Sequence, residues 1–410
     1  MTDITVTATA DDLLKALSGP EFRADPYPLY RQLREIAPLH RSSLDGLWYA
    51  SRHEDCRQVL THPRCGHQRD HARFLGLSEE RAEQFSRSQR ASLIQQNPPE
   101  HTRLRGLVSR AFTRGRVQAL GPRIVELVES MLDTMAQAGE ADVMADLAYP
   151  LPVAVIGELV GVPAGEREAF RGLIADSTAA AEVYASPEAV KAAERADAFM
   201  DTYFVDLVAR RRAEPADDLL FGLIAAHDAG GRLSEEELVA MAVLLFLAGF
   251  ATTSHLIGNG LLALLRHPAE FDRLWNDPSL APSAVEEMLR WDPSIQATVR
   301  TTFEPIELGG QVIQTGETVI TLLGAANRDP ARFPDSERFD VGRADNPHLS
   351  FAAGIHHCLG ASLARLEGQI VFSRFIERFR HVELADDDPP WTASSKIRGL
   401  DALPVRLQPR

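Results

Sequence analysis

The chain has little cysteine and a shortage of basic residues, and both limit what it can be. Its 410 residues include three cysteines, Cys56, Cys65 and Cys358, which cannot form an even disulfide framework and indicate a reducing compartment. Lysine and arginine number 43 against 58 aspartates and glutamates, a formal net charge of −15. Nucleic-acid phosphates are bound by basic surfaces, so this balance argues against a general nucleic-acid-binding protein.

The first twenty residues contain no apolar run long enough for a signal peptide or membrane anchor, so we expect a soluble, cytoplasmic protein that does not contact a membrane. Residues 1–22 are expected to form an N-terminal tail. The composition, 45% hydrophobic and 25% charged, is that of an ordinary folded protein. Because no linker, repeat or low-complexity segment interrupts the sequence, we expect one large domain over residues 1–410.

The clearest predicted helix begins after Ser234. Ser234 and Glu237 have the spacing of a capping box, and the apolar pattern continues to about Arg266, a length on the order of 50 Å. Residues 238–251 are apolar on every side, which is typical of a helix buried at the core. This apolar stretch is too short for a membrane span and begins beside three glutamates.

Helical periodicity dominates residues 100–300, with strand-like segments towards both ends. We expect a strand at 46–50, a helix at 52–62, and a small antiparallel sheet at 306–321 with turns at Gly309-Gly310 and Gly316. Residues 64–96 form a long connection, of a kind that is often functional, and 327–350 a structured loop. The predicted fold class is mainly α with a minor β region.

One cysteine lies in a setting that suits a thiolate. Residues 351–360 read FAAGIHHCLG, and an amphipathic helical pattern begins just after them. A helix start supplies free backbone N–H groups and positive potential, which favour the thiolate of Cys358. Gly354 and Gly360 allow tight turns and the close approach of a flat group. A cysteine thiolate is a known axial ligand of haem iron. The alternative is a buried, inert cysteine.

These ten residues resemble the haem-binding signature of the cytochrome P450 family, F-G-x-G-x-H-x-C-x-G, with Ala352 where the family generally has glycine. The resemblance extends over nearly the whole chain. It implies the cytochrome P450 fold, with haem b between the long helix and the Cys358 segment, where Phe351 and Gly360 also bind the cofactor. It further implies a monooxygenase, with Cys358 as the iron ligand, that uses O2 and two electrons to oxidise a C–H bond.

Four basic side chains match positions that bind the haem propionates in this family. His101 and Arg105 are four residues apart and would share one helix face, where two donors suit an anion. Arg300 and His356 complete the set. Each alone would more often be a surface residue, but four donors along the chain have one economical explanation.

Three charged residues are assigned to fold integrity rather than catalysis. Glu287 and Arg290, three apart on a predicted helix, can form an ion pair, and Arg338 follows in DSERFD. Together they resemble the E-x-x-R pair and third arginine of the family's structural triad.

The segment AGFATT, residues 248–253, resembles the family's oxygen-binding sequence A-G-x-[D/E]-T-T. The resemblance implies that Thr252 hydrogen-bonds to bound oxygen and that Gly249 makes room for it. The alternative is a Thr252 hydroxyl bonded to its own helix. The usual acid is replaced by Ala251, which cannot relay protons. Protons could instead come through water, Thr252 or the substrate, or the product could be atypical, by coupling or desaturation. A peroxide-driven reaction is a further alternative.

The substrate pocket is expected above the haem, with contributions from residues 64–96 and 174–190. We expect a hydrophobic small molecule, a natural-product biosynthetic intermediate, as substrate. The residues assigned to the pocket are Leu244, Leu247, Ala248, Ile295, Ala297, Thr298 and Ile397.

The stretch from Arg103 to Arg116 holds five arginines and no acid. In an acidic protein such a patch can steer an acidic partner, and the resemblance implies a ferredoxin, reduced by ferredoxin reductase with NAD(P)H. The alternative is a solvated helix face.

Two other functions are alternatives to a monooxygenase. A non-catalytic haem sensor would need the Cys358 segment but not the AGxxTT sequence, so Thr252 favours the enzyme. A cysteine hydrolase would need a histidine and an acid in a supporting motif, and none is recognisable.

Overall fold

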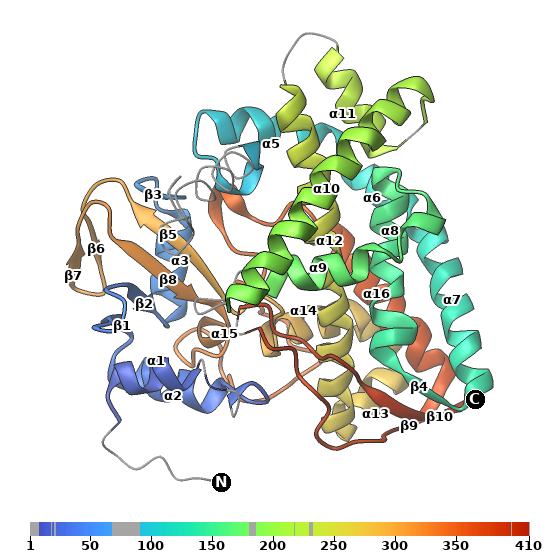
Figure 1. Cartoon of the computed structure of the whole chain (residues 1–410). Coiled ribbons are helices and arrows are strands. Elements are labelled where there is room, and N and C mark those ends of the chain that lie inside the picture. The colour runs from blue at the N-terminus through green and yellow to red at the C-terminus, as the bar shows by residue number, and fades with distance from the viewer. Residues whose placement is uncertain are drawn as a thin grey trace.

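Helices fill most of the molecule, as the computed structural model shows, with most strands on one side and a separate three-stranded sheet on the opposite side (Figure 1). It describes residues 8–17, 19, 22–67, 91–179, 186–216, 218–228, 233–394 and 396–409. The expected fold class, mainly α with a minor β region, is confirmed. Most of the expected 64–96 connection, residues 68–90, and residues 180–185 of the expected 174–190 pocket segment lie outside the described residues.

The helices in the described part of the chain are α1 (Ala10–Leu17), α2 (Tyr27–Ile36), α3 (His53–Thr61), α5 (Glu100–Ala111), α6 (Arg114–Ala119), α7 (Gly121–Ala138), α8 (Pro150–Val160), α9 (Phe170–Ala179), α10 (Pro187–Ala213), α11 (Leu219–Asp228), α12 (Glu235–Arg266), α13 (Pro268–Asn276), α14 (Ala281–Trp291), α15 (Leu323–Ala326) and α16 (Ala361–Arg378). The strands are β1 (Leu39–Arg41), β2 (Trp48–Ala50), β3 (Cys65–Gly66), β4 (Glu140–Asp142), β5 (Ala297–Thr302), β6 (Ile306–Leu308), β7 (Gln311–Ile313), β8 (Thr318–Leu322), β9 (Phe379–Leu384) and β10 (Pro404–Pro409).

Helix α12 crosses the centre of the molecule, where α8, α10, α14 and α16 pack around it (Figure 1). The predicted capping box is present: the Glu237 N–H donates to the Ser234 hydroxyl, and the Ser234 N–H donates to the Glu237 carboxylate. By length and hydropathy α12 could span a membrane. Its apolar side chains instead pack against the surrounding helices, as in the core helix of a soluble protein.

The expected sheet at 306–321 is right only in part. Strands β6 and β7 form a two-residue hairpin, because Gly309 and Gly310 both have positive φ angles, of 53° and 78°. Strand β8 leaves this hairpin and pairs antiparallel with β5 and parallel with β2. It thereby joins a five-stranded sheet of order β1-β2-β8-β5-β3, in which the paired strands β8 and β5 lie between strands of the N-terminal region.

The expected N-terminal tail also needs correction. Residues Ala10–Leu17 form α1, which packs against α2 and buries Leu13 and Leu14. Asp11 anchors this helix to the loop before β2, accepting hydrogen bonds from His40 and from the N–H and hydroxyl of Ser43. Apolar side chains on one face of a short helix explain why this segment folds onto the domain.

Candidate active site

The Cys358 segment folds back on itself immediately before α16. The Cys358 N–H donates to the Phe351 carbonyl at 2.9 Å, and the His357 N–H donates to the Gly354 carbonyl at 3.1 Å. Gly354 has a φ of 72°, and a Cβ there would lie 2.5 Å from the Leu60 carbonyl oxygen, so only glycine fits. The loop therefore fixes the cysteine against α3 and at the entrance of α16.

Burial and positive potential act in opposite directions on the Cys358 thiol. One side of the residue is exposed, but the protein around the others raises its pKa above that of a free cysteine. The backbone N–H groups of Gly360 and Ala361, together with the guanidinium groups of Arg105 and Arg365, counter this effect. These donors suit a thiolate, which needs a further positive charge to be the stable form.

The structure brings together the four basic residues that lie far apart in the sequence. The rings of His101 and His356 are 4.3 Å apart between centroids, and Arg105 donates to the His357 carbonyl at 2.8 Å. Arg300, on β5, is 3% exposed. Burial together with Arg300, His101 and Arg105 lowers the pKa of His356 to about 3, which places these positive groups near its ring.

This basic cluster lacks an acidic partner among the described residues. Arg300 donates only to the Val299 carbonyl and the Thr298 hydroxyl, and Arg105 only to the His357 carbonyl, within that part of the chain. The Nε2 atoms of His101 and His356 are buried without a hydrogen-bond partner. Burial lowers the pKa of Arg300 to about 10. Buried cations are normally paired, so this group of donors suits an anion supplied by a bound molecule.

Across the long helix, a stripe of side chains is left uncovered. Ala248 is exposed and Leu244 and Thr252 are half-buried, although their neighbours Leu245 and Phe246 lie in the core. Positions 244, 248 and 252 are spaced four apart and so share one face of α12. A central helix with one open face is what a flat ligand packed beside it would require.

The AGFATT segment lies where α8 packs against α12. A Cβ on Gly249 would lie 3.0 Å from Ile156 of α8, so this glycine permits close packing of the two helices, and its role in making room for oxygen stays a prediction. Ala251 is buried in the apolar cluster between these helices. The Thr252 hydroxyl donates to the Ala248 carbonyl at 2.9 Å, so it does bond to its own helix. Its oxygen remains able to accept a hydrogen bond.

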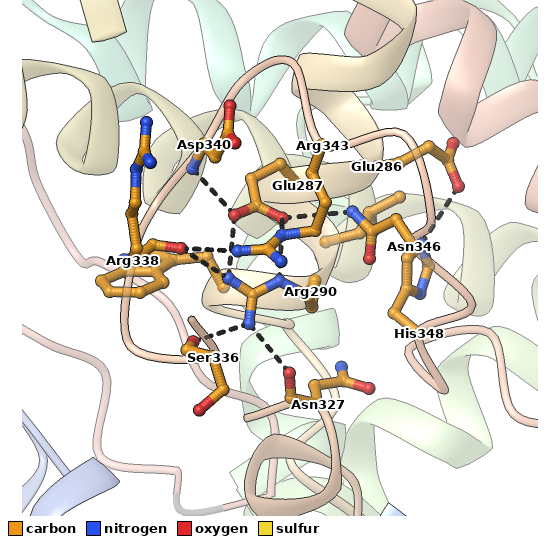
Figure 2. Close-up of polar contacts among 12 residues, drawn as sticks. Glu286, Glu287, Arg290, Asn327, Ser336, Arg338, Asp340, Arg343, Asn346 and His348 are labelled. Carbon is orange, nitrogen blue, oxygen red and sulfur yellow. Dashed lines mark hydrogen bonds and ion pairs between the residues drawn. The ribbon is translucent and has the colours of Figure 1, made fainter. Parts of the chain in front are cut away.

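The structural triad contains Arg343 rather than the side chain of Arg338 (Figure 2). Arg290 donates twice to Glu287 at 2.8 Å, and Arg343 Nε donates to the same carboxylate at 3.0 Å. The Arg338 side chain is largely exposed, 3.9 Å from Glu270. Its carbonyl, however, accepts from both Arg290 and Arg343. The expectation for Arg338 is thus wrong for the side chain, because it is the backbone of that residue that turns into the network.

A second ion-pair network, missed in the sequence, supports the cysteine segment. Glu286 accepts two hydrogen bonds from Arg365 of α16 and one from His348. Burial raises the pKa of Glu286, but these bonds outweigh it and hold the pKa at about 2. The Arg365 guanidinium lies over the Phe351 ring, 4.5 Å from its centroid. The adjacent residues Glu286 and Glu287 therefore both bind the loop that leads to Cys358. Only Glu287 belongs to a recognisable sequence motif.

The residues assigned to the pocket are all at least partly exposed. Ile295 and Ile397 are brought together by an antiparallel bridge between their segments. On β5, Thr298 lies on the same face as Arg300, two residues away, so that it is directed towards the basic cluster. Leu244, Leu247 and Ala248 lie on α12. Ala297 lies on the opposite face of β5 from Thr298 and packs against the apolar cluster of α1 and α2, so the structure does not bring it to the other pocket residues.

Comparison with known proteins identifies this arrangement. A family model described as cytochrome P450 matches residues 184–406. Cytochrome P450 107B1 of Saccharopolyspora erythraea is 42% identical over 396 residues, covering 94% of this chain and 96% of the relative. From the same organism, 6-deoxyerythronolide B hydroxylase is 38% identical over 405 residues, covering 95% and 97%. The chain belongs to the cytochrome P450 family.

A solved structure shows the same fold. P450BioI, in complex with an acyl carrier protein ligated to hexadec-9Z-enoic acid, superposes with a TM-score of 0.89 at 35% identity, covering 96% of this cytochrome P450 and 100% of that chain. As a member of the family, this protein is a monooxygenase, an oxidoreductase that incorporates oxygen from O2, and it binds haem b.

The residues present fit that cofactor. The exposed side of Cys358 and the open stripe of α12 suit the two faces of a flat macrocycle, and the basic cluster offers unpaired donors for carboxylates at its edge. Bound haem would supply the iron centre at which O2 is reduced, with Cys358 donating electron density to the metal. His101, Arg105, Arg300 and His356 would hold the propionates, and the apolar part of the stripe would exclude water.

Proposed function

We propose that this cytochrome P450 hydroxylates a hydrophobic natural-product intermediate in the cytoplasm, with electrons from a ferredoxin and its NAD(P)H-dependent reductase. The observation that carries the proposal is the uncovered stripe of α12, where Leu244, Leu247 and Ala248 present an almost entirely apolar surface beside Thr252. The relative named for hydroxylating 6-deoxyerythronolide B supports the choice of substrate class and reaction.

The other pocket positions support an apolar substrate in the same way. Ile295 and Ile397 are paired by a bridge, and Thr298 lies two residues before Arg300 on the same face of β5, so two separate segments present small or aliphatic side chains. Ala297, on the other face of β5, packs against the apolar cluster of α1 and α2. A hydrophobic molecule gains free energy by leaving water for such a surface, about 25 cal/mol for each Å² of apolar area buried.

Substrate binding is tested by titrating the purified haem protein with 6-deoxyerythronolide B and with hexadec-9Z-enoic acid while recording its absorption spectrum. We expect a spin-state shift with one of them, and a new oxygenated product on turnover. Leu247→Glu should abolish the shift because it places a charge in the pocket, whereas Ile36→Glu, a change of an exposed residue on α2, should leave it intact. Equal binding by both variants would contradict the pocket assignment.

The proposed ferredoxin site surrounds the Cys358 loop. The basic stretch 103–116 is divided between α5 and α6, and Arg103 pairs with Glu237, so not all five arginines are available to a partner. Arg110 and Arg114 are exposed, and Ile355, three residues before Cys358, is 50% exposed. An exposed apolar residue next to the cysteine and exposed arginines on α5 and α6 suit a small acidic protein that must approach the cysteine side closely.

Docking is tested by the rate of reduction by a surrogate ferredoxin at several salt concentrations. Arg110→Glu and Arg114→Glu should each slow reduction and weaken its salt dependence, because both remove positive potential. Arg195→Glu makes the same charge change on α10 and should have little effect. A reduction rate independent of salt and of Arg110 and Arg114 would overturn the docking site.

A peroxide-driven reaction is the second candidate, favoured by the apolar surroundings of Ala251. Hydrogen peroxide brings its own protons and electrons, so a missing acid would matter less. Product formed from substrate and hydrogen peroxide as fast as with ferredoxin, reductase and NADPH would support it. Turnover that requires the electron-transfer proteins would exclude it.

A further inference from the structure

Thr252 needs a hydrogen-bond donor that the neighbouring residue cannot provide. Its hydroxyl proton is already directed to the Ala248 carbonyl, at 2.9 Å, so the oxygen can act only as an acceptor. Ala251 carries no polar atom. Reduction of O2 with cleavage of the O–O bond consumes two protons, so another group of this chain must stand between solvent and Thr252, directly or through water.

The next turn of α12 carries a histidine in a suitable position. His255 follows Thr252 by three residues and Ala251 by four, so the three residues share one side of the helix. Side chains in a helix lean towards its N-terminus, and a residue therefore covers the surface over the preceding turn. We therefore expect the imidazole of His255 to lean towards the turn that contains Ala251 and Thr252.

The imidazole is deeply buried and incompletely paired. His255 is 4% exposed, and its Nδ1 has no hydrogen-bond partner. The ring lies against Gly399, where a Cβ would fall 1.8 Å from Nδ1, and the edge of Tyr149 lies 6.2 Å away between ring centroids. Gly399 lies two residues after Ile397, which is one of the residues assigned to the pocket. The ring therefore lies between the core of α12 and the rim of the pocket.

Burial lowers the pKa of His255 to about 4, and no charged group among the described residues counters it, so the ring is neutral at physiological pH. Two charged groups act on its neighbour Tyr149: Arg171 lies over that ring, 4.7 Å from its centroid, and Asp401 raises the pKa of its hydroxyl. A neutral imidazole has one donor and one acceptor nitrogen, as a relay requires.

We propose that His255 is the positioning residue that conducts protons to Thr252 in place of the acid that Ala251 replaces. One ring nitrogen takes up a proton from water while the other gives its own proton to a water molecule that is hydrogen-bonded to the Thr252 hydroxyl oxygen. The net charge of the ring is unchanged, and exchange with water restores the first tautomer. The proposal rests on the oxygen-activating reaction of the family and not on the identity of the substrate.

The competing buried acid is Glu367 of α16. It is 1% exposed, its Oε2 has no hydrogen-bond partner, and burial raises its pKa to about 8. A proton held there is also available for donation. His255 is preferred because it lies on the same helix as Thr252, one turn away, and covers that turn. Glu367 lies on a different helix, α16, whose adjacent residue Gly368 packs near Leu256 of α12.

The first test measures contact with water and not turnover. The holoenzyme, labelled with 15N-histidine, is reduced under carbon monoxide to give a diamagnetic form, and the His255 ring signal is identified by its loss in His255→Gln. We expect magnetisation to pass from water to the ring N–H, because a relay must exchange protons with water. A ring N–H protected from water would overturn the proposal.

The second test measures the fraction of consumed O2 that is released as hydrogen peroxide, with a surrogate ferredoxin, its reductase, NADPH and hexadec-9Z-enoic acid as the probe. His255→Leu should raise this fraction, and the double variant His255→Leu/Ala251→Asp should lower it again, since an acid then stands beside Thr252. Ser254→Ala removes another buried hydroxyl of α12, one bonded to the Phe250 carbonyl, and should leave it unchanged.

The outcomes of this second test separate the possible roles. A merely structural role for His255 would not be rescued by Ala251→Asp. An unchanged peroxide fraction in His255→Leu, or complete release as peroxide by the unaltered protein, would overturn the proposal. A change seen in Glu367→Gln and absent in His255→Leu would assign the relay to the acid of α16. Because none of these readings requires the natural substrate, failure here is distinct from failure of the proposed substrate class.

Discussion

Arg105 Nη2 donates a hydrogen bond to the carbonyl of His357 at 2.8 Å, and His357 immediately precedes Cys358. This contact ties α5 to the loop that presents the thiol. Burial raises the pKa of Cys358, and the same guanidinium acts against that rise; together with burial it also contributes to the low pKa of His356. One arginine therefore orders the loop, favours the thiolate and adds positive charge to the cluster proposed to hold the propionates.

Arg105→Ala should weaken the retention of haem. It removes a hydrogen bond and one cation from the cluster, and a charge-assisted hydrogen bond contributes about 1.5–3 kcal/mol. We expect haem transfer to apomyoglobin to be faster by roughly one to two orders of magnitude. Arg110→Ala, on the exposed side of the same helix, serves as the control and should transfer haem as the unaltered protein does. Equal rates for the two variants would remove Arg105 from the cofactor site.

The corrected triad predicts different effects for two nearby arginines. Arg343→Ala removes one of the two charged donors to Oε2 of the fully buried Glu287, which keeps Arg290 and Asn346, and this should cost about 1.5–3 kcal/mol in the free energy of unfolding. Arg338→Ala removes an exposed side chain and keeps the carbonyl that accepts from Arg290 and Arg343, so the cost should be about 1 kcal/mol or less. Urea unfolding of both variants decides the matter, and the opposite order would restore Arg338 to the triad.

Ala352→Gly should stabilise the cysteine loop. Ala352 has a φ of 54°, a left-handed conformation that costs a residue with a Cβ about 1–2 kcal/mol. Glycine removes this strain but loses about 0.4–1 kcal/mol through the greater freedom of the unfolded chain. We expect a net gain of about 0.5–1 kcal/mol in urea unfolding. Ala353→Gly, at an extended φ of −146°, relieves no strain and should be slightly destabilising. A loss of stability in Ala352→Gly would show that its methyl group has packing of its own.

The stability of the protein should fall in mild acid, partly through His255. Its pKa in the folded protein, about 4, lies below the ordinary value of 6.5, so below pH 6.5 the unfolded chain binds more protons than the folded one. The stabilisation is complete above pH 6.5 and is lost as the pH falls towards 4, about 2 kcal/mol of it by pH 5. His255→Asn should remove this part of the pH dependence. Parallel curves of unfolding free energy against pH for the two proteins would contradict the assignment.

Local sequence rules predicted the elements whose signals are local. The capping box at Ser234 and Glu237 fixed the start of α12, and the ten residues around Cys358 were recognisable because their glycines and histidines are constrained by the loop itself. The pairing of β8 with β5 and β2 joins segments far apart in the chain, and no turn signal reports it. The helix α1 was overlooked because eight residues give a weak periodic pattern.

The directions of individual side chains could not be predicted from the sequence either. Arg338 and Arg343 are both near the right place in the sequence, and the choice between them depends on how an irregular loop turns, which spacing does not determine. Gly249 was placed correctly on α12, but only the helix packing shows that its open side meets Ile156. His255 gave no signal of its own, since a single histidine on an apolar helix is usually a core residue and its burial and missing partner emerge from the fold.

We infer that Cys358 would ligate the iron of bound haem. The absorption spectrum of the reduced protein under carbon monoxide tests this assignment. We expect a Soret band shifted strongly to the red of that of histidine-ligated haem, and the loss of that shift in Cys358→His. A Soret band at the position of histidine-ligated haem in the unaltered protein, or no haem band after full reconstitution, would contradict it.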